Sequence, residues 1–151
     1  YKELEKELAQ LGAKLLVEIL PKYISGEIVP KEQDHERATF TKMLKREDGL
    51  INWDRPAEEI YNQIRALNPE PGTWTKWKNK ILNIKTSEVG PHYIEVQSPI
   101  PGTVVKIDGS VAVTTKTCYL ILKQIQLEGG KVMDAKSFIN GHLDFLDSLL
   151  R

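Results

Sequence analysis

The chain has 151 residues, of which 40% are hydrophobic and 28% charged, so it is expected to fold as one globular domain, alone or with an appendage. This composition excludes a disordered, collagen-like or low-complexity chain, and no apolar run approaches the ~20 residues of a membrane span. The 21 basic and 21 acidic residues balance, which argues against a polycation that coats nucleic acid.

The first predicted element is an amphipathic helix that opens directly at the start of the chain. Its apolar residues recur at spacings of three and four: Leu4, Leu8, Leu11, Leu15 and Ile19. Gly12 is a candidate break into two helices, and Ser25-Gly26 is a candidate stop. Because the stripe has no apolar partner nearby and Tyr1 already lies in the pattern, we expect the chain to be a piece of a longer polypeptide.

The next segment, residues 27–48, is predicted to be a linker. It is polar, shows little periodicity, and carries ten charged groups between Lys31 and Asp48. A second helix follows it, with Asp54 as the expected N-cap and Pro56 in the first turn. The apolar stripe of this helix is Ala57, Ile60, Ile64 and Leu67, and Pro69 and Pro71 end it.

From Thr73 onward the apolar period changes to two, which predicts about five short antiparallel strands. Asp108-Gly109 is the expected hairpin turn between two runs. The other apolar runs are 81–84, 93–96, 104–107, 111–113 and 119–125. A last helix, capped by Asp134, is expected to carry Phe138, Ile139, Leu143, Leu146 and Leu150. The predicted fold is mainly β with flanking helices, a small closed or partly open antiparallel barrel preceded by a helical segment and a linker.

Neither a catalytic nor a metal site is predicted. The three histidines have no zinc-ligand spacing, phosphate-binding glycine loops are absent, and Asp54, Glu58 and Glu59 fit capping of a helix start better than catalysis. Cys118 is the only cysteine, which excludes an internal disulfide and predicts a reducing compartment, the cytoplasm.

The best-supported interaction chemistry is cationic. Residues 76–136 carry nine basic and five acidic groups, and the lysines of the first strand region alternate with Trp74 and Trp77. Such a strand places charge on one face, where several phosphates are neutralised together, although a solvated strand face explains the same pattern. Trp53 and Trp74 are expected in the core rather than as stacking platforms. The candidate phosphate contacts are Lys42, Lys45, Arg46, Lys76, Lys78 and Lys80, followed by Lys136 and His142.

Five segments resemble the carboxyl-terminal half of the methionyl-tRNA formyltransferase family. The family patterns are a QD…ATY..KL.K linker, an IDW segment, IRAxNPWPG, PGT[IV] and MSAxxFLNG. Their counterparts here, in the same order and with the same spacing, are QD with ATFTKMLK at 33–45, DGLINWDRPA at 48–57, IRALNPEPGTW at 64–74, PGTV at 101–104 and MDAKSFING at 133–141.

The resemblance implies that the chain has three parts and that catalysis and tRNA binding belong to different domains. Residues 1–26 would be the helical end of a Rossmann-like formyltransferase domain, 27–48 a linker, and 49–151 an oligonucleotide-binding (OB-like) domain that helps hold initiator methionyl-tRNA. The family's catalytic Asn, His and Asp, and its formyl donor 10-formyltetrahydrofolate, belong to the upstream domain. The chain by itself is therefore predicted to be inactive and to bind no cofactor.

The sequence departs from the family pattern at three positions. Glu70 stands for the Trp of NPWP, Asn52 for the Asp of IDW, and His142 for the Arg that usually follows FLNG. Arg65 and Asn68 match the motif but lie near a helix end, where a carboxylate partner and a capping role are expected. Two alternatives stay open: a structural domain of a sugar-nucleotide or folate-linked formyl enzyme, and a free-standing nucleic-acid-binding module.

Overall fold

The structure is a computed structural model that describes residues 2–90 and 100–151, with the side chain of Lys2 excepted. The chain divides into two compact units, Tyr1–Met43 and Leu44–Arg151, which are treated separately below. The predicted strand at 93–96 and His92 lie outside the described residues.

The first unit contains one long helix, α1 (Lys2–Ile24), and a short 3-10 turn, η1 (His35–Arg37). The expected break at Gly12 is wrong, since α1 runs through it without interruption. The helix stops where predicted, because Gly26 has a φ of 78° and the Glu27 N–H bonds back to the Lys22 carbonyl at 2.9 Å. The leucines of the predicted stripe are all exposed within the unit.

The second unit begins with the 3-10 turn η2 (Arg46–Gly49) and the helix α2 (Ala57–Leu67). The predicted stripe of α2 is confirmed, with Ala57, Ile60, Ile64 and Leu67 all buried. Asp54 is not its N-cap: the helix starts later, and the Ala57 N–H donates to Thr117 Oγ1 at 3.2 Å. The cap therefore comes from a residue 60 positions away, which local pattern does not reveal.

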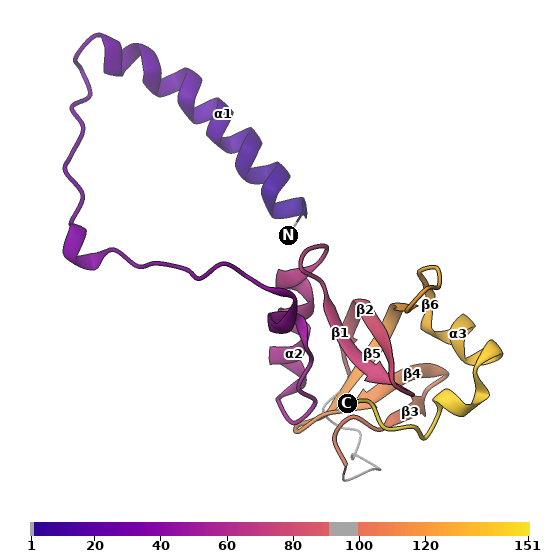
Figure 1. Ribbon diagram of the computed structural model, residues 1–151. Helices are drawn as coiled ribbons and strands as arrows, with labels where there is room; N and C mark the ends of the chain where they lie inside the picture. Colours follow the sequence, from indigo (N-terminus) through magenta and orange to yellow (C-terminus); the bar gives the residue numbers. More distant parts are fainter. Residues whose placement is uncertain (1, 91–99) are drawn as a thin grey trace. The chain divides into compact units, whose positions relative to one another are not determined.

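A six-stranded antiparallel sheet forms the body of the second unit (Figure 1). Its ladder runs in the order β1-β2-β5-β4-β3, and β6 pairs with β5. The β3–β4 turn is the predicted Asp108-Gly109, whose φ values of 47° and 72° suit a two-residue hairpin. The strands are β1 (Thr73–Trp77), β2 (Lys80–Val89), β3 (Val104–Ile107), β4 (Ser110–Thr114), β5 (Tyr119–Leu127) and β6 (Met133–Asp134).

The last helix is shorter than predicted. Asp134 caps α3 (Ala135–Gly141) as expected, accepting the Lys136 N–H at 2.8 Å, but the helix ends at Gly141 and is followed by the 3-10 turn η3 (Leu143–Phe145). Leu146 lies in a turn and Leu150 in an extended segment bonded to Gly102, so neither belongs to a helix. The helical spacing of these leucines misled the prediction, because the segment pairs with strands instead.

This carboxyl-terminal segment connects the two edge strands of the ladder. The Val104 N–H donates to the Ser148 carbonyl at 2.9 Å, while the N–H groups of Lys76 and Arg151 each donate to the other residue's carbonyl, at 2.6 and 3.1 Å. The ladder itself is not closed, so the prediction of a mainly β fold with flanking helices is confirmed for an open sheet whose edges are bridged.

One hydrophobic core fills the second unit, and the helices α2 and α3, which lie on opposite sides of the strands in Figure 1, both contribute side chains to it. It joins Ile60 and Ile64 of α2 to Leu82 and Ile84 of β2, and it includes Phe138 of α3. Each of these side chains is almost fully buried, which stabilises the fold by roughly 1.5–3 kcal/mol per side chain relative to exposure.

Candidate nucleic-acid interface

The lysines of the first strand region do not line one face of a strand, as the alternating pattern predicted. Lys78 and Asn79 have φ values of 49° and 61° and form the two-residue turn between β1 and β2. The strand therefore ends at Trp77, and Lys80 pairs with Trp77 across the hairpin. Lys76 belongs to the opposite face, because successive residues of a strand point to opposite sides.

Trp77 organises the first group of predicted cations. Its buried indole contacts the rings of Phe138, Phe145 and His142 edge to face, at centroid distances of 5.2–5.6 Å. The Lys78 ammonium lies 5.0 Å from the Trp77 ring centroid, so Lys78, Lys80 and His142 come together around this indole. We call Trp77, Lys78, Lys80 and His142 the Trp77 cluster.

Two members of the Trp77 cluster are held by neighbours that the sequence did not indicate. Lys78 forms an ion pair with Asp144 of η3, and both side chains are more than half exposed. The His142 ring stacks on Phe138 at 4.1 Å with an interplanar angle of 7°, and its Nδ1 lies 3.2 Å from the Phe138 carbonyl oxygen. Stacking explains how a histidine occupies a half-buried position here.

The second group of predicted cations lies beside Trp74. The assignment of Trp74 to the core is wrong: its neighbours Thr73 and Thr75 are buried, whereas Trp74 points to the other face and is half-buried. The Trp74 indole Nε1 donates to the carbonyl of Arg46 at 2.9 Å. Trp53, by contrast, is in the core as predicted, and its Nε1 donates to Thr75 Oγ1 at 3.1 Å.

Lys45 and Arg46 enter this second group through η2. The Lys45 N–H donates to Asp48 Oδ2 at 2.8 Å, which fixes the turn, and both basic side chains are exposed. Lys42 belongs to the first unit and is exposed. The predicted phosphate contacts therefore do not form one group. They lie on both faces of β1, and Lys42 belongs to a different unit of the chain.

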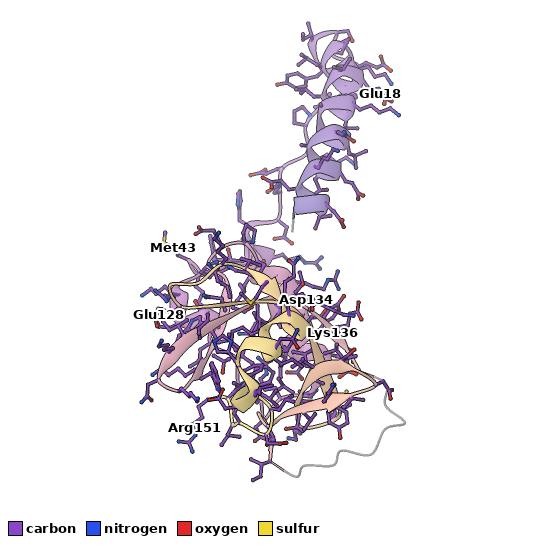
Figure 2. All side chains as sticks on the ribbon, turned by 90° about the vertical axis from the view of Figure 1, so that its right-hand side faces the viewer. Glu18, Met43, Glu128, Asp134, Lys136 and Arg151 are labelled. Atoms are coloured by element: carbon purple, nitrogen blue, oxygen red, sulfur yellow. The ribbon has the colours of Figure 1, made fainter. Side chains whose placement is uncertain are left out.

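Lys136 and the two helix-end residues complete the predicted set. Lys136 is exposed in the first turn of α3, next to Asp134 (Figure 2). Asn68 caps α2 as expected, with its Nδ2 donating to the Ile64 carbonyl at 2.8 Å. Arg65 lies over the Tyr61 ring at 5.2 Å, a contact that the sequence did not predict.

The described residues offer little reactive chemistry. They contain no group of three or more His, Cys, Asp or Glu side chains placed to hold a metal ion. Cys118 is buried, and burial raises the pKa of its thiol above the ordinary value. None of the described helices is long and apolar enough to cross a membrane.

One basic residue of the Trp74 face was missed by sequence reasoning. Arg151 pairs its main chain with Lys76, and residues paired this way in antiparallel strands have their side chains on the same side. Figure 2 shows Arg151 at the outer margin of the second unit. The two residues are 75 positions apart, and no motif of the sequence connects them.

Comparison with known proteins shows the family to which this chain is similar. Residues 43–143 match the family described as formyl transferase, C-terminal domain. A methionyl-tRNA formyltransferase of Carboxydothermus hydrogenoformans is 40% identical over 142 residues, which are 93% of this chain and 45% of that protein. The methionyl-tRNA formyltransferase of Bacillus subtilis is 38% identical over 152 residues, 97% of this chain and 46% of that protein. The chain thus spans about half the length of the curated relatives it matches.

Solved structures share the fold at low sequence identity. HypX from Aquifex aeolicus, in a complex with tetrahydrofolic acid, is 14% identical and superposes with a TM-score of 0.62. The match covers 88% of this chain and 23% of that one. At this identity the similarity establishes the arrangement of helices and strands and nothing further.

Proposed function

This chain belongs to the formyl transferase C-terminal domain family, and from that membership we propose that it is the RNA-positioning part of a methionyl-tRNA formyltransferase. The observation that carries the proposal is the 38–41% identity, over more than nine-tenths of the chain, to relatives that bear this name. The substrate of the parent protein is then initiator methionyl-tRNA, and the reaction adds a formyl group to the amino group of its methionine.

The role of this part is to orient the tRNA, and its means are contacts to phosphate. Contacts of this kind fix the position of a nucleic acid without reading its sequence. The proposed contacts are Lys42, Lys45, Arg46, Lys76, Lys78, Lys80, Lys136 and His142. Their exposure supports this role for the lysines and Arg46, whereas His142 is half-buried and presents only part of its ring.

The groups that transfer the formyl moiety are proposed to lie in an upstream catalytic domain of the parent protein. The relatives are about twice as long as the matched region, which leaves room for such a domain. That domain would take the formyl group from 10-formyltetrahydrofolate, and the parent enzyme would act in the cytoplasm, where translation begins. This chain supplies no catalytic residue in the proposal.

Salt-dependent binding of initiator tRNA to the 151-residue chain tests the proposal. The logarithm of the association constant should fall linearly with the logarithm of salt concentration, with a slope of about −0.9 for each phosphate contact. Replacing Lys80 and Lys136 by Gln should flatten the slope by about two units, because both lysines are exposed and proposed to contact phosphate.

A matched double variant controls for net charge. Lys106→Gln with Lys116→Gln removes the same two charges at exposed positions outside the proposed set and should leave the slope unchanged. Absence of tRNA binding at low salt would refute the proposal and favour a domain of a small-molecule formyl enzyme. Equal binding of initiator tRNA and a duplex DNA of similar charge would instead favour a general nucleic-acid-binding module.

A further inference from the structure

The outward face of β1 carries an aromatic side chain between basic ones. Trp74 and Lys76 lie two residues apart on this face, so their backbones are separated by about 6.7 Å along the strand. Arg151 is paired with Lys76 on one side, and Arg46 lies next to the Trp74 indole on the other. We call Arg46, Trp74, Lys76 and Arg151 the Trp74 strip.

The indole of Trp74 is fixed in place and only partly buried. Its single polar atom, Nε1, is bonded to the Arg46 carbonyl at 2.9 Å, and its backbone is paired with Asn83 of β2 and bridged to Leu50. An aromatic ring anchored at its edge and half-buried loses little conformational entropy when a flat partner stacks on it. The two other tryptophans, at 53 and 77, are buried and cannot act in this way.

The basic side chains of the strip are available for a ligand. Among the described residues, no ion pair joins Arg46, Lys76 or Arg151 to a carboxylate, in contrast to Lys78, which is paired with Asp144. All three are exposed. On the β2 side, Glu128 accepts the Ile81 N–H through its Oε2 at 3.0 Å.

We propose that the Trp74 strip binds an unpaired nucleotide of RNA, with its base stacked on the Trp74 indole and its flanking phosphates on Lys76 and Arg151. A duplex hides the faces of its bases, so a stacking platform serves a single-stranded segment. Every base has a π face, so this contact tolerates any sequence while the cations supply the attraction. The inference rests on the proposed function and adds to it the kind of RNA segment that this face receives.

Binding of a uridine octamer to the 151-residue chain tests the strip, with an abasic octamer of the same charge as the comparison ligand. Trp74→Ala should weaken binding of the uridine octamer by between about 5-fold and 150-fold, the range of one lost base stack. The affinity of the same variant for the abasic octamer should stay within twofold of the wild-type value, because the phosphates of that ligand remain neutralised. Lys76→Gln with Arg151→Gln should weaken the binding of both octamers. It should also flatten the salt slope by about 1.4, since each phosphate contact to a single strand contributes about 0.7 to that slope.

Two further variants separate stacking from folding. Trp74→Phe keeps a ring but loses the bond to the Arg46 carbonyl, so its affinity for the uridine octamer should lie between those of the wild type and Trp74→Ala. Ile81→Ala changes a partly buried apolar residue on the same outward face and should leave the affinity unchanged. Circular dichroism melting of each variant verifies that the second unit is folded.

The outcomes distinguish this inference from the proposed function. If initiator tRNA binds while Trp74→Ala and Trp74→Phe bind the uridine octamer as the wild type does, the strip is refuted and the proposed function stands. If Trp74→Ala lowers the affinity for the uridine and abasic octamers equally, stacking is refuted. If the uridine octamer binds through Trp74 and initiator tRNA does not bind at all, the strip stands and the proposed function is refuted.

Discussion

Gly49 lies where the end of η2 touches the start of β1, and it has no room for a side chain. A Cβ built on Gly49 would come 2.0 Å from the carbonyl oxygen of Gly72, well below any real contact distance. The Gly72 N–H in turn donates to the Leu67 carbonyl at 2.8 Å, so the opposing backbone is itself held and has little freedom to retreat. Replacing Gly49 by Ala should therefore push η2 away from β1.

The expected cost follows from two contributions. Forcing extra atoms into a packed site costs typically 1–3 kcal/mol. Moving η2 also strains the bond from the Ile51 N–H to the Trp74 carbonyl, now 2.9 Å, and such a bond contributes about 1 kcal/mol. We expect Gly49→Ala to lower the free energy of unfolding by about 2–4 kcal/mol.

Urea unfolding followed by tryptophan fluorescence measures this quantity for the second unit alone, because Trp53, Trp74 and Trp77 all belong to that unit. The matched control is Gly141→Ala at the end of α3, where a Cβ would meet nothing within 4 Å, and it should be neutral or slightly stabilising. A Gly49→Ala protein within 0.5 kcal/mol of the wild type would show that η2 does not depend on this close approach.

Three further predictions concern the cap, the ion pair and the thiol. Thr117→Val should lower the free energy of unfolding by about 1 kcal/mol because it removes the acceptor of the Ala57 N–H, whereas Thr117→Ser should restore it in the same urea titration. Asp144→Asn should cost at most about 1 kcal/mol, since Asp144 and Lys78 are more than half exposed; a larger loss would contradict a surface ion pair. Burial raises the pKa of the Cys118 thiol, so stability should be full below the ordinary thiol pKa and fall as pH rises through the folded-state value. Iodoacetamide at pH 8 should leave this thiol unmodified until urea unfolds the chain, and rapid alkylation of the folded protein would contradict its burial.

Local pattern was sufficient wherever an element is determined by its own residues. The stripe of α2 was correct because one helix face is buried along its whole length. Asp108-Gly109 and Asp134 were correct because a two-residue turn and an N-cap each depend on the chemistry of one or two positions. The family resemblance likewise came from contiguous motifs within residues 33–141.

Pattern failed where the structure depends on contacts between distant residues. Lys78 and Asn79 adopt positive φ without glycine, so the predicted alternation of lysine and tryptophan continued across a turn that only Asn79 marks. The leucines after Gly141 keep helical spacing, yet their segment is held by hydrogen bonds to Gly102, Val104 and Lys76. Both errors arise because these segments are fixed by pairing with distant residues, and the periodicity of a local sequence does not indicate such partners.

These long-range pairings place the proposed binding groups on opposite faces of a single strand, β1. Because the turn at Lys78 follows directly on Trp77, the inward indole gathers Lys78 and His142, while the outward indole of Trp74 is left between Arg46 and Lys76. In this way basic residues gather near Trp74 and Trp77 although the chain as a whole has no net charge.

In Arg151 the main chain has a structural role, and the side chain has the binding role proposed above. The main chain of Arg151 bridges to the edge strand β1, and its carbonyl also accepts from Thr75 Oγ1 at 3.1 Å. Its side chain takes no part in either bond. Arg151→Gln therefore changes the charge of the Trp74 strip and leaves the bridge between the sheet edges intact. For this reason a loss of RNA affinity in that variant reports on phosphate contact rather than on unfolding.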